Sequence, residues 1–403
     1  MKLQERFAAE LRDELVADIL PYWLDRMTDP TGGYFGRRDY SDTLIETAPR
    51  GAILNARILW TFSAAYRLLG DKTYLEAATH AFGYFSSRFI DSSYGGVYWS
   101  LNADGSPLDT KKQFYAIAFA IYGLSEYARA TSSALAAELA VNLYDSIEKH
   151  SLDRVNGGYI EALGRDWKEL ADVRLSEKDA NSPKSMNTHL HILEAYTALY
   201  RVAPSDRLAS SIENLLGIFL TRIMSHETGH LGLFFNMEWR RQDNIISYGH
   251  DIEASWLLLE AALVLGRPEL TDIVKNACRR IADAALEGRL DDGSMIYEAE
   301  YGESGPDTID GDRHWWVQAE DVVGLIWLYT MHGVEPALRK AYNSWLWIRA
   351  HLLDTGHGEW RWSIKADGMP DNTEDKAGFW KCPYHNSRMC IETIERLGNH
   401  TID

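Results

Sequence analysis

Apolar residues recur at three- and four-residue spacing along most of the chain, which is the spacing that places them on one face of an α-helix. Turn-rich stretches separate these runs, and some runs end in stop signals, such as Gly266 followed by Pro268. The pattern predicts twelve helices, at residues 3–27, 52–69, 73–90, 113–131, 133–150, 185–203, 205–224, 250–266, 268–287, 315–333, 335–353 and 385–397.

A glycine followed by aromatic or apolar residues recurs between the helical runs, as in "GGYFG", "GGVYWS" and "GEWRWSI". Successive copies are separated by 62 to 71 residues, a nearly constant step. Each copy predicts a short hairpin or extended turn, because glycine adopts backbone angles that other residues avoid. The marker glycines of the six copies are Gly33, Gly96, Gly158, Gly229, Gly293 and Gly358.

Helical hairpins repeated at one step can stack into an open solenoid or close into a ring. A solenoid needs polar capping repeats, which the sequence lacks, and no Pro- or Ser-rich linker divides the chain. One helix of each pair is markedly apolar, as in "FYAIAFAIYGL" and "ASWLLLEAALVLG". We therefore expect one all-α domain over residues 1–403. Its fold would be an (α/α)6 barrel of twelve helices in six hairpins, with short β-hairpin loops at one mouth.

Polar and aromatic residues interrupt the apolar inner helices close to their starts. Buried polar groups need partners, so these helices would pack more easily without them. Because the six starts converge on one cavity in such a ring, we expect a shared functional pocket there. The residues are Arg57, Tyr115, Asn187, His189, His191, His250, Glu253, Trp315, Trp316, Glu320, Trp380 and His385.

Two histidines in this set have a glutamate three residues later, on the same helix face: His250 with Glu253, and His191 with Glu194. A carboxylate placed in this way can orient an imidazole and tune its basicity. His189 points away from His191, and we expect it to be a structural histidine near the helix start that is hydrogen-bonded to a neighbour.

Metal binding is not expected. The two histidine–glutamate pairs could hold a metal between inner helices, but no further carboxylates stand at matching positions. The segment "HETGH" at 226–230 matches a zinc pattern that requires both histidines on one helix face. Gly229 is a marker glycine of a turn, so that requirement fails.

Two histidines on opposite sides of a bound molecule can take a proton from one face of a carbon and return one to the other, because imidazole exchanges protons near neutrality. His250 and His385, on the fourth and sixth inner helices, are the candidates. In an aldose the acidic carbon is C2 of the open-chain form. Its deprotonation gives an enediolate, which Arg57 would stabilise, and His191 would open the sugar ring.

Composition narrows the partners. A formal net charge of −18 disfavours nucleic acid and anionic membranes, and no apolar run is long enough to span a bilayer. The amino-terminal segment has no signal-peptide core, and three cysteines form no disulfide framework. No phosphate-binding loop or dinucleotide fingerprint is present. We expect a cytoplasmic enzyme without a cofactor, as a monomer or weak dimer. The 14 tryptophans and 21 tyrosines supply flat faces with a polar edge, which suit a sugar ligand.

Five segments resemble the motifs of the cellobiose 2-epimerases, within the N-acylglucosamine 2-epimerase superfamily: "NARILW", "KSMNTHLHILEAY", "SYGHDIEASWLL", "WWVQAE" and "WKCPYHNSRMC". The resemblance covers nearly the whole chain, and Ser387 is the departure, where this family is expected to have glycine. It implies an (α/α)6 barrel that inverts C2 of the reducing-end sugar of β-1,4-linked disaccharides such as cellobiose, lactose or mannobiose.

The resemblance also implies a role for each site residue. His250 and His385 are the acid/base catalysts, His191 opens the ring, Arg57 stabilises the enediolate, and Glu253 is the partner of the catalytic pair. The expected substrate contacts are Tyr115, Asn187, Trp316 and Trp380, to which we add Glu320.

Three alternatives remain open. An aldose–ketose isomerase or an N-acylhexosamine 2-epimerase would act on a monosaccharide. A glycoside hydrolase on the same barrel would need two carboxylates flanking the bond, for which Glu253 and Glu320 are available. A non-catalytic sugar-binding protein would explain the tryptophans but not two histidines at helix starts.

Overall fold

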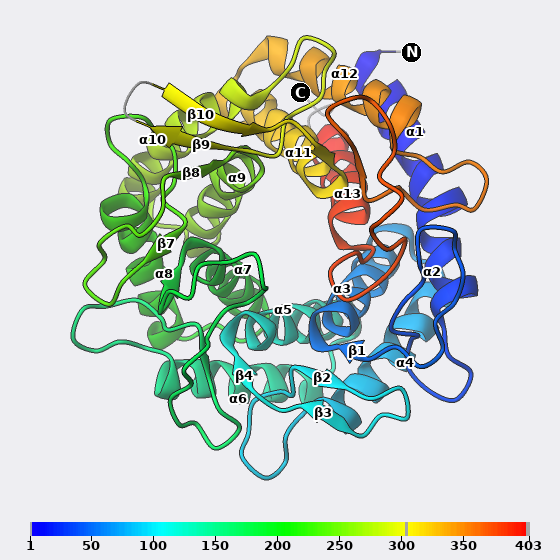
Figure 1. Ribbon diagram of the computed structural model, residues 1–403, viewed down its shortest axis with the longest axis vertical. Coiled ribbons are helices and arrows are strands. Elements are labelled where there is room, and N and C mark those ends of the chain that lie inside the picture. The colour runs from blue at the N-terminus through cyan, green and yellow to red at the C-terminus, as the bar shows by residue number, and fades with distance from the viewer. Residues whose placement is uncertain (1, 303–304, 400–403) are drawn as a thin grey trace.

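Six apolar helices stand around the centre of the computed structural model, in their order along the chain (Figure 1). Each contacts the next, and the last contacts the first, which closes the ring. The structure describes residues 2–302 and 305–399. The inner helices are α3 (Ala52–Leu69), α5 (Phe114–Thr131), α7 (Met186–Val202), α9 (Tyr248–Leu265), α11 (Trp315–His332) and α13 (Tyr384–Asn399).

The outer ring begins with one continuous helix that packs against α13, so the two ends of the chain join. It comprises α1 (Leu3–Glu14), a π-helical turn (Leu15–Ile19) and α2 (Leu20–Met27). The others are α4 (Lys72–Arg88), α6 (Ala134–His150), α8 (Asp206–Ile218) with a π-helical turn (Phe219–Ile223), α10 (Pro268–Ala285) with a 3₁₀ turn (Leu286–Gly288), and α12 (Glu335–His351).

With the first outer helix counted as one, the described part of the chain forms the twelve predicted helices, each with boundaries within two residues of those expected. The predicted (α/α)6 barrel is confirmed. No helix in this part of the chain combines the length and the apolarity that crossing a bilayer requires.

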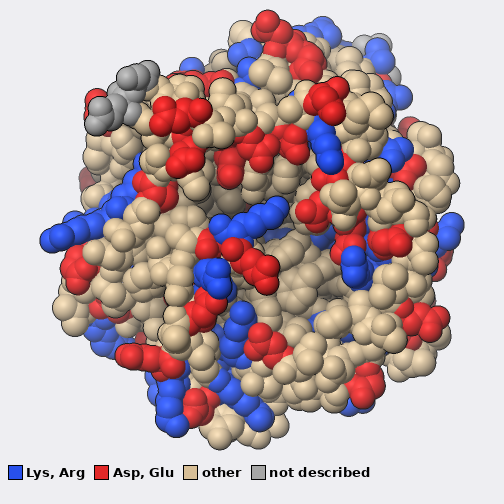
Figure 2. Space-filling model, in the orientation of Figure 1, with Lys and Arg blue, Asp and Glu red and all other residues tan. Residues whose placement is uncertain are grey.

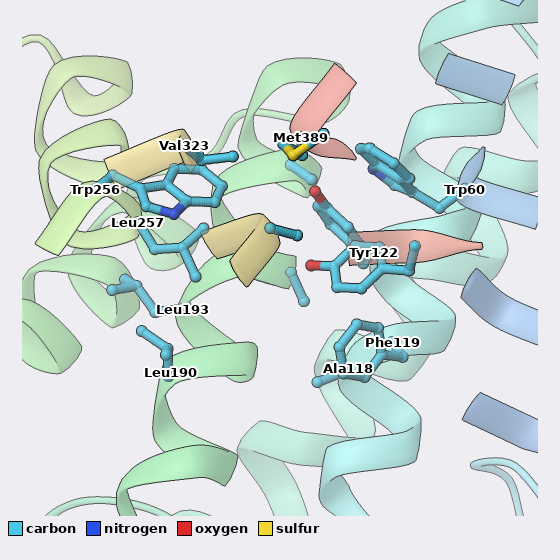
Figure 3. Packing of buried hydrophobic residues seen from close by; sticks show 14 of the residues in the cluster. Trp60, Ala118, Phe119, Tyr122, Leu190, Leu193, Trp256, Leu257, Val323 and Met389 are labelled. Atoms are coloured by element: carbon cyan, nitrogen blue, oxygen red, sulfur yellow. The ribbon is translucent and has the colours of Figure 1, made fainter. Parts of the chain in front are cut away.

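The inner helices are apolar around most of their circumference because protein covers them on every side. The three leucines at 257–259 of α9 are each about 1% exposed. An outer helix such as α10 instead buries one stripe, which includes Val274 and Cys278. Figure 3 shows packing among the inner helices, where Trp60 stacks on Tyr122 with ring centroids 5.4 Å apart.

Short antiparallel strands precede five of the inner helices. Each pairs with a strand that follows the next outer helix, so a helical hairpin separates the two strands of each pair. Consecutive strands pair, as the predicted short β-hairpin loops require, in β2 with β3 and in β9 with β10. The pairs are β1 (Arg50–Gly51) with β2 (Ser100–Leu101), which also pairs with β3 (Pro107–Asp109); β4 (Lys112–Gln113) with β5 (Ala162–Leu163); β6 (Lys184–Ser185) with β7 (Phe234–Phe235); β8 (Ile245–Ser247) with β9 (Glu298–Gly302), which also pairs with β10 (Gly305–Asp310); and β11 (Arg313–His314) with β12 (Ser363–Ile364).

The marker turns are confirmed as turns. Every marker glycine has a positive φ, and an antiparallel bridge closes each turn. The bridges join Thr28 to Tyr34, Ile90 to Val97, Leu152 to Tyr159, Met224 to Leu231, Arg289 to Met295, and Leu353 to Trp360.

Several of these turns also fix the segment that leads into the next inner helix. Asp91 begins one turn and binds the buried Lys112 at 2.8 Å, and Asp153 begins the next and binds Lys184 at 2.7 Å. Both lysines lie in strands directly before an inner helix. A buried ion pair adds little net stability but imposes a defined geometry, so these pairs set where the inner helices begin.

Candidate active site

The starts of the inner helices surround a cavity of about 390 Å³, and Figure 2 shows the hollow near the centre of this face. A second chamber of about 400 Å³ adjoins it, because Asn187, His250 and Tyr297 line both. All but one of the residues predicted to have a catalytic or substrate-binding role line the first cavity, as does Trp315. They are Arg57, Tyr115, Asn187, His191, His250, Glu253, Trp316, Trp380 and His385.

Glu320 is the predicted residue that lies outside this lining. It is fully buried, and its Oε1 lies 2.7 Å from Nδ1 of His385. Its Oε2 accepts a hydrogen bond from Trp256 Nε1 at 3.1 Å. Both oxygens are therefore used by protein groups, so Glu320 orients His385 from behind, and the expectation of a substrate contact does not fit this placement.

His250 and His385 face the same space from α9 and α13. The Trp316 ring contacts both, with centroids 4.7 Å from His250 and 5.7 Å from His385. Burial lowers the pKa of each histidine to about 3, and for His385 the bond to Glu320 opposes this only in part. Both imidazoles are therefore neutral in the empty site at neutral pH.

The partner of His250 differs from the expected one. Its Nδ1 lies 2.8 Å from Oγ of Ser247, one residue before α9, whereas Glu253 binds elsewhere. For the other predicted pair the spacing argument is confirmed, because Nδ1 of His191 lies 2.8 Å from Oε2 of Glu194.

His189 is a structural histidine hydrogen-bonded to its neighbours, as predicted. Its Nδ1 lies 2.6 Å from the carbonyl oxygen of Ser185, and its Nε2 accepts a hydrogen bond from the amide of Tyr159 at 2.9 Å. Burial lowers its pKa to about 4. Both ring nitrogens are occupied by backbone groups, so His189 has no free nitrogen for chemistry.

Arg388 joins the carboxylates of three inner helices and was missed in the sequence. It is fully buried, and its Nη2 donates to Oε1 of Glu253 at 2.5 Å and of Glu320 at 2.6 Å. Its Nη1 donates to Glu194 and to the hydroxyl of Tyr384. Helices α7, α9 and α11 each contribute one glutamate to a single guanidinium from α13.

The three carboxylates around this guanidinium differ in protonation state. Burial favours the neutral form of each and is the largest single influence. At Glu194 and Glu320, Arg388 and the bonded histidine together outweigh burial and leave the pKa values lowered, that of Glu320 to about 2. Burial, with the adjacent charge of Glu320, raises the pKa of Glu253 to about 8. Two of the carboxylates are thus ionised at neutral pH, while Glu253 holds a proton.

Arg57 is a buried cation with spare donors. Its Nη2 donates to the Tyr115 hydroxyl at 3.0 Å and its Nη1 to Sγ of Cys382 at 3.6 Å, while its Nε has no partner among the described residues. None of its bonds goes to a carboxylate. A buried charge without a counterion is costly, and a ligand that develops negative charge next to it would offset that cost. Oδ1 of Asn187 is likewise buried, on the cavity wall, without a partner.

Other lining residues were not predicted. Two features of the sequence could have indicated some of them. His314 directly precedes the "WW" motif, and Trp362 belongs to the aromatic residues of the last marker turn. The segment before α7 gave no periodic signal, yet it lies over the cavity. The residues include Tyr297, His314 and Trp362, and, from that segment, Leu175, Lys178 and Asp179.

This geometry has counterparts among known proteins. The family model of N-acylglucosamine 2-epimerase (GlcNAc 2-epimerase) matches residues 33–388. The chain belongs to this family. As a member it is a carbohydrate epimerase, an enzyme of the isomerase class.

Two curated relatives and one solved structure are similar along nearly their whole length. A cellobiose 2-epimerase of Bacteroides fragilis is 54% identical over 97% of this chain and 100% of its own. One of Ruminococcus albus is 39% identical over 96% and 98%. The structure of cellobiose 2-epimerase from Bacillus thermoamylovorans superimposes with a TM-score of 0.93 at 40% identity, covering 97% of this chain and 100% of that one.

Proposed function

We propose that this epimerase inverts C2 of the reducing-end sugar of β-1,4-linked disaccharides. Cellobiose would become glucosyl-mannose, lactose epilactose, and mannobiose mannosyl-glucose. The observation that carries the proposal is that His250 and His385 border one cavity while Trp316 contacts both rings. The relatives named as cellobiose 2-epimerases support this substrate class.

The first step is the opening of the sugar ring, because C2 becomes acidic only beside the C1 carbonyl. We assign this step to His191. Its Nδ1 is bonded to Glu194, which leaves Nε2 on the cavity wall to move a proton between the anomeric hydroxyl and the ring oxygen. Tyr115 packs edge-on against its ring, with centroids 5.0 Å apart, and holds the ring in place.

Proton transfer at C2 needs one neutral and one protonated histidine. The neutral ring takes the C2 proton, the protonated ring then gives its proton to the opposite face, and the two protonation states are exchanged. Glu320 stabilises the charged form of His385 at 2.7 Å. Both rings are neutral in the free enzyme, so one of them must take up a proton from solvent before C2 is deprotonated.

The intermediate is an enediolate, whose negative charge spreads over the oxygens on C1 and C2. Arg57 supplies a buried cation whose Nε is free, and preorganised donors of this kind stabilise charge that develops in the transition state. Asn187 offers its unpartnered Oδ1 to a sugar hydroxyl. Trp316 and Trp380 supply flat faces on the cavity wall for the sugar.

A disaccharide fits the two adjoining chambers better than a monosaccharide does. The first chamber is lined by both catalytic histidines, and the second extends to polar groups such as Arg174, Asp310 and Asp312. The reducing-end sugar would occupy the first chamber and the other sugar the second. A monosaccharide would leave the second chamber to water.

A glycosidase mechanism finds no support in the carboxylates. Oxygens of Glu253 and Glu320 lie within 4.8 Å of one another and bind the same nitrogen of Arg388. Inverting hydrolysis needs carboxyl groups about 6.5–9.5 Å apart with a water between them, and retaining hydrolysis needs about 5–5.5 Å with the sugar between them. Here the guanidinium of Arg388, and not a water or a sugar, lies between the two carboxylates.

The test is incubation of the purified protein with cellobiose in deuterated water, followed by proton NMR. Deuterium at C2 of a glucosyl-mannose product supports the proposal. Release of glucose would indicate a hydrolase, and a ketose product an aldose–ketose isomerase. If cellobiose is inert while mannose or N-acetylglucosamine reacts, the disaccharide assignment is wrong and a monosaccharide enzyme replaces it.

A further inference from the structure

Glutamate replaces glycine at one position of the repeated turns. Three turns carry a glycine pair whose second member is Gly33, Gly96 or Gly158, with φ of +73°, +69° and +80°. In the last turn Gly358 is followed by Glu359, which adopts the same left-handed conformation with φ of +58°. A residue with a Cβ is strained in this region, and such strain persists where surrounding contacts impose it.

The space beside this position is used differently in the last turn. A Cβ added to Gly33, Gly96 or Gly158 would come within 3 Å of an aromatic ring from a neighbouring segment. In the last turn the glutamate side chain itself extends into the protein and is fully buried. The strained residue therefore introduces a carboxylate where those three turns receive a ring.

The carboxylate of Glu359 binds the segment that carries part of the active site. Its Oε1 accepts from Lys381 Nζ and from Asn386 Nδ2, both at 2.7 Å. Its Oε2 accepts from Trp23 Nε1 at 2.6 Å, which ties the same group to the outer helix. Lys381 is fully buried as well, so the ion pair is shielded from water and its geometry is fixed.

This segment needs such an anchor because α13 begins differently from the other inner helices. For α3, α5, α7, α9 and α11, a paired strand ends at the residue before the helix. Before α13 the last ladder contact is the bridge of Ala377 with Arg38, seven residues before Tyr384. The intervening stretch contains Trp380, and His385 follows it directly; both line the cavity.

We propose that Glu359 is a positioning residue, which holds residues 380–386 so that Trp380 and His385 point into the cavity. Among the residues that line the cavity are both of these, but neither Glu359 nor Lys381, so the effect passes through the segment. The proposal rests on the role of His385 in the proposed function.

The test uses two variants, Glu359→Gly and Asn386→Ala. The first introduces the glycine of the three turns with a glycine pair, which relieves the backbone strain but removes all the bonds of the Glu359 carboxylate. The second removes only the bond from Asn386. We expect kcat for cellobiose epimerisation to fall roughly 100-fold in Glu359→Gly, the loss that a small misplacement of a catalytic group produces, and less in Asn386→Ala. Phe85→Leu, in the core of outer helix α4, is the control for lost stability alone.

A second readout separates this inference from the proposed function. In protein with ¹⁵N-labelled histidines, the ring signals of His385 should shift and broaden in Glu359→Gly while those of His191 stay in place. Unchanged His385 signals with wild-type kcat would overturn the positioning role. If the wild-type protein does not turn over cellobiose but the His385 signals still move, the positioning role stands and the proposed function fails. If Glu359→Gly does not fold, Asn386→Ala decides by the same two readouts.

Discussion

His385 Nδ1 and Arg388 Nη2 bind the same oxygen of Glu320, at 2.7 and 2.6 Å. The two side chains lie three residues apart on α13, so one turn of helix carries both an imidazole and the cation that keeps its carboxylate partner ionised. Through this oxygen, the orientation of the His385 ring depends on the network of Arg388 with its three glutamates. Several consequences can be measured.

Arg388→Met should both destabilise the barrel and stop catalysis. Without the guanidinium, Glu194, Glu253 and Glu320 would be buried together with no cation among them. Removing one member of a buried charge network costs about 3–5 kcal/mol. Urea denaturation should show this loss, whereas Arg339→Met, at an exposed position of outer helix α12, should change stability by less than about 0.5 kcal/mol. A variant as stable as the wild type would contradict the central role of Arg388.

His250→Ala and His385→Ala should each abolish net epimerisation while the barrel stays folded. A single remaining histidine can still take the C2 proton and exchange it with solvent, but it returns the proton to the same face. Each variant should therefore incorporate deuterium at C2 of unchanged cellobiose more readily than it forms product. His226→Ala, at an exposed position, is the control and should keep wild-type turnover. Normal turnover in either of the first two variants would rule out a mechanism with two bases.

Features of this fold and site that depend on local sequence could be predicted, and those that depend on contacts between distant segments could not. Helical periodicity is local, so all twelve helices were found, and the glycine step revealed the ring. Residues such as Arg57 and His250 stood out because they are polar on otherwise apolar helices. The bond of Ser247 to His250 was not predicted, because it depends on the bend at a helix start rather than on helical spacing. Arg388 looked like an ordinary polar residue, since its three partners come from other helices.

Acidification should destabilise the protein in part through His250. Burial lowers its native pKa to about 3, whereas an unfolded histidine titrates near 6.5. Between these values the unfolded state binds the proton and the native state does not, so the free energy of unfolding decreases as the pH falls. From pH 7 to pH 5 this single residue should contribute about 2 kcal/mol of that decrease. Urea denaturation at both pH values should give a smaller decrease for His250→Gln than for the wild type. An equal decrease in both proteins would mean that native His250 is charged.

Chelation should leave activity unchanged, although the site contains a group of metal-binding donors. Atoms of Glu253, Glu320 and His385 lie within 4.8 Å of one another, a spacing that suits a divalent ion. Arg388 Nη2 binds both carboxylates at 2.5 and 2.6 Å, so a permanent positive charge already occupies the point where the donors converge. Dialysis against EDTA should therefore preserve turnover, and loss of activity that zinc or manganese restores would refute this assignment. The same argument predicts that Arg388→Met, where it folds, binds more zinc than the wild type when both are loaded and measured by elemental analysis, because only the guanidinium keeps the carboxylates from a metal.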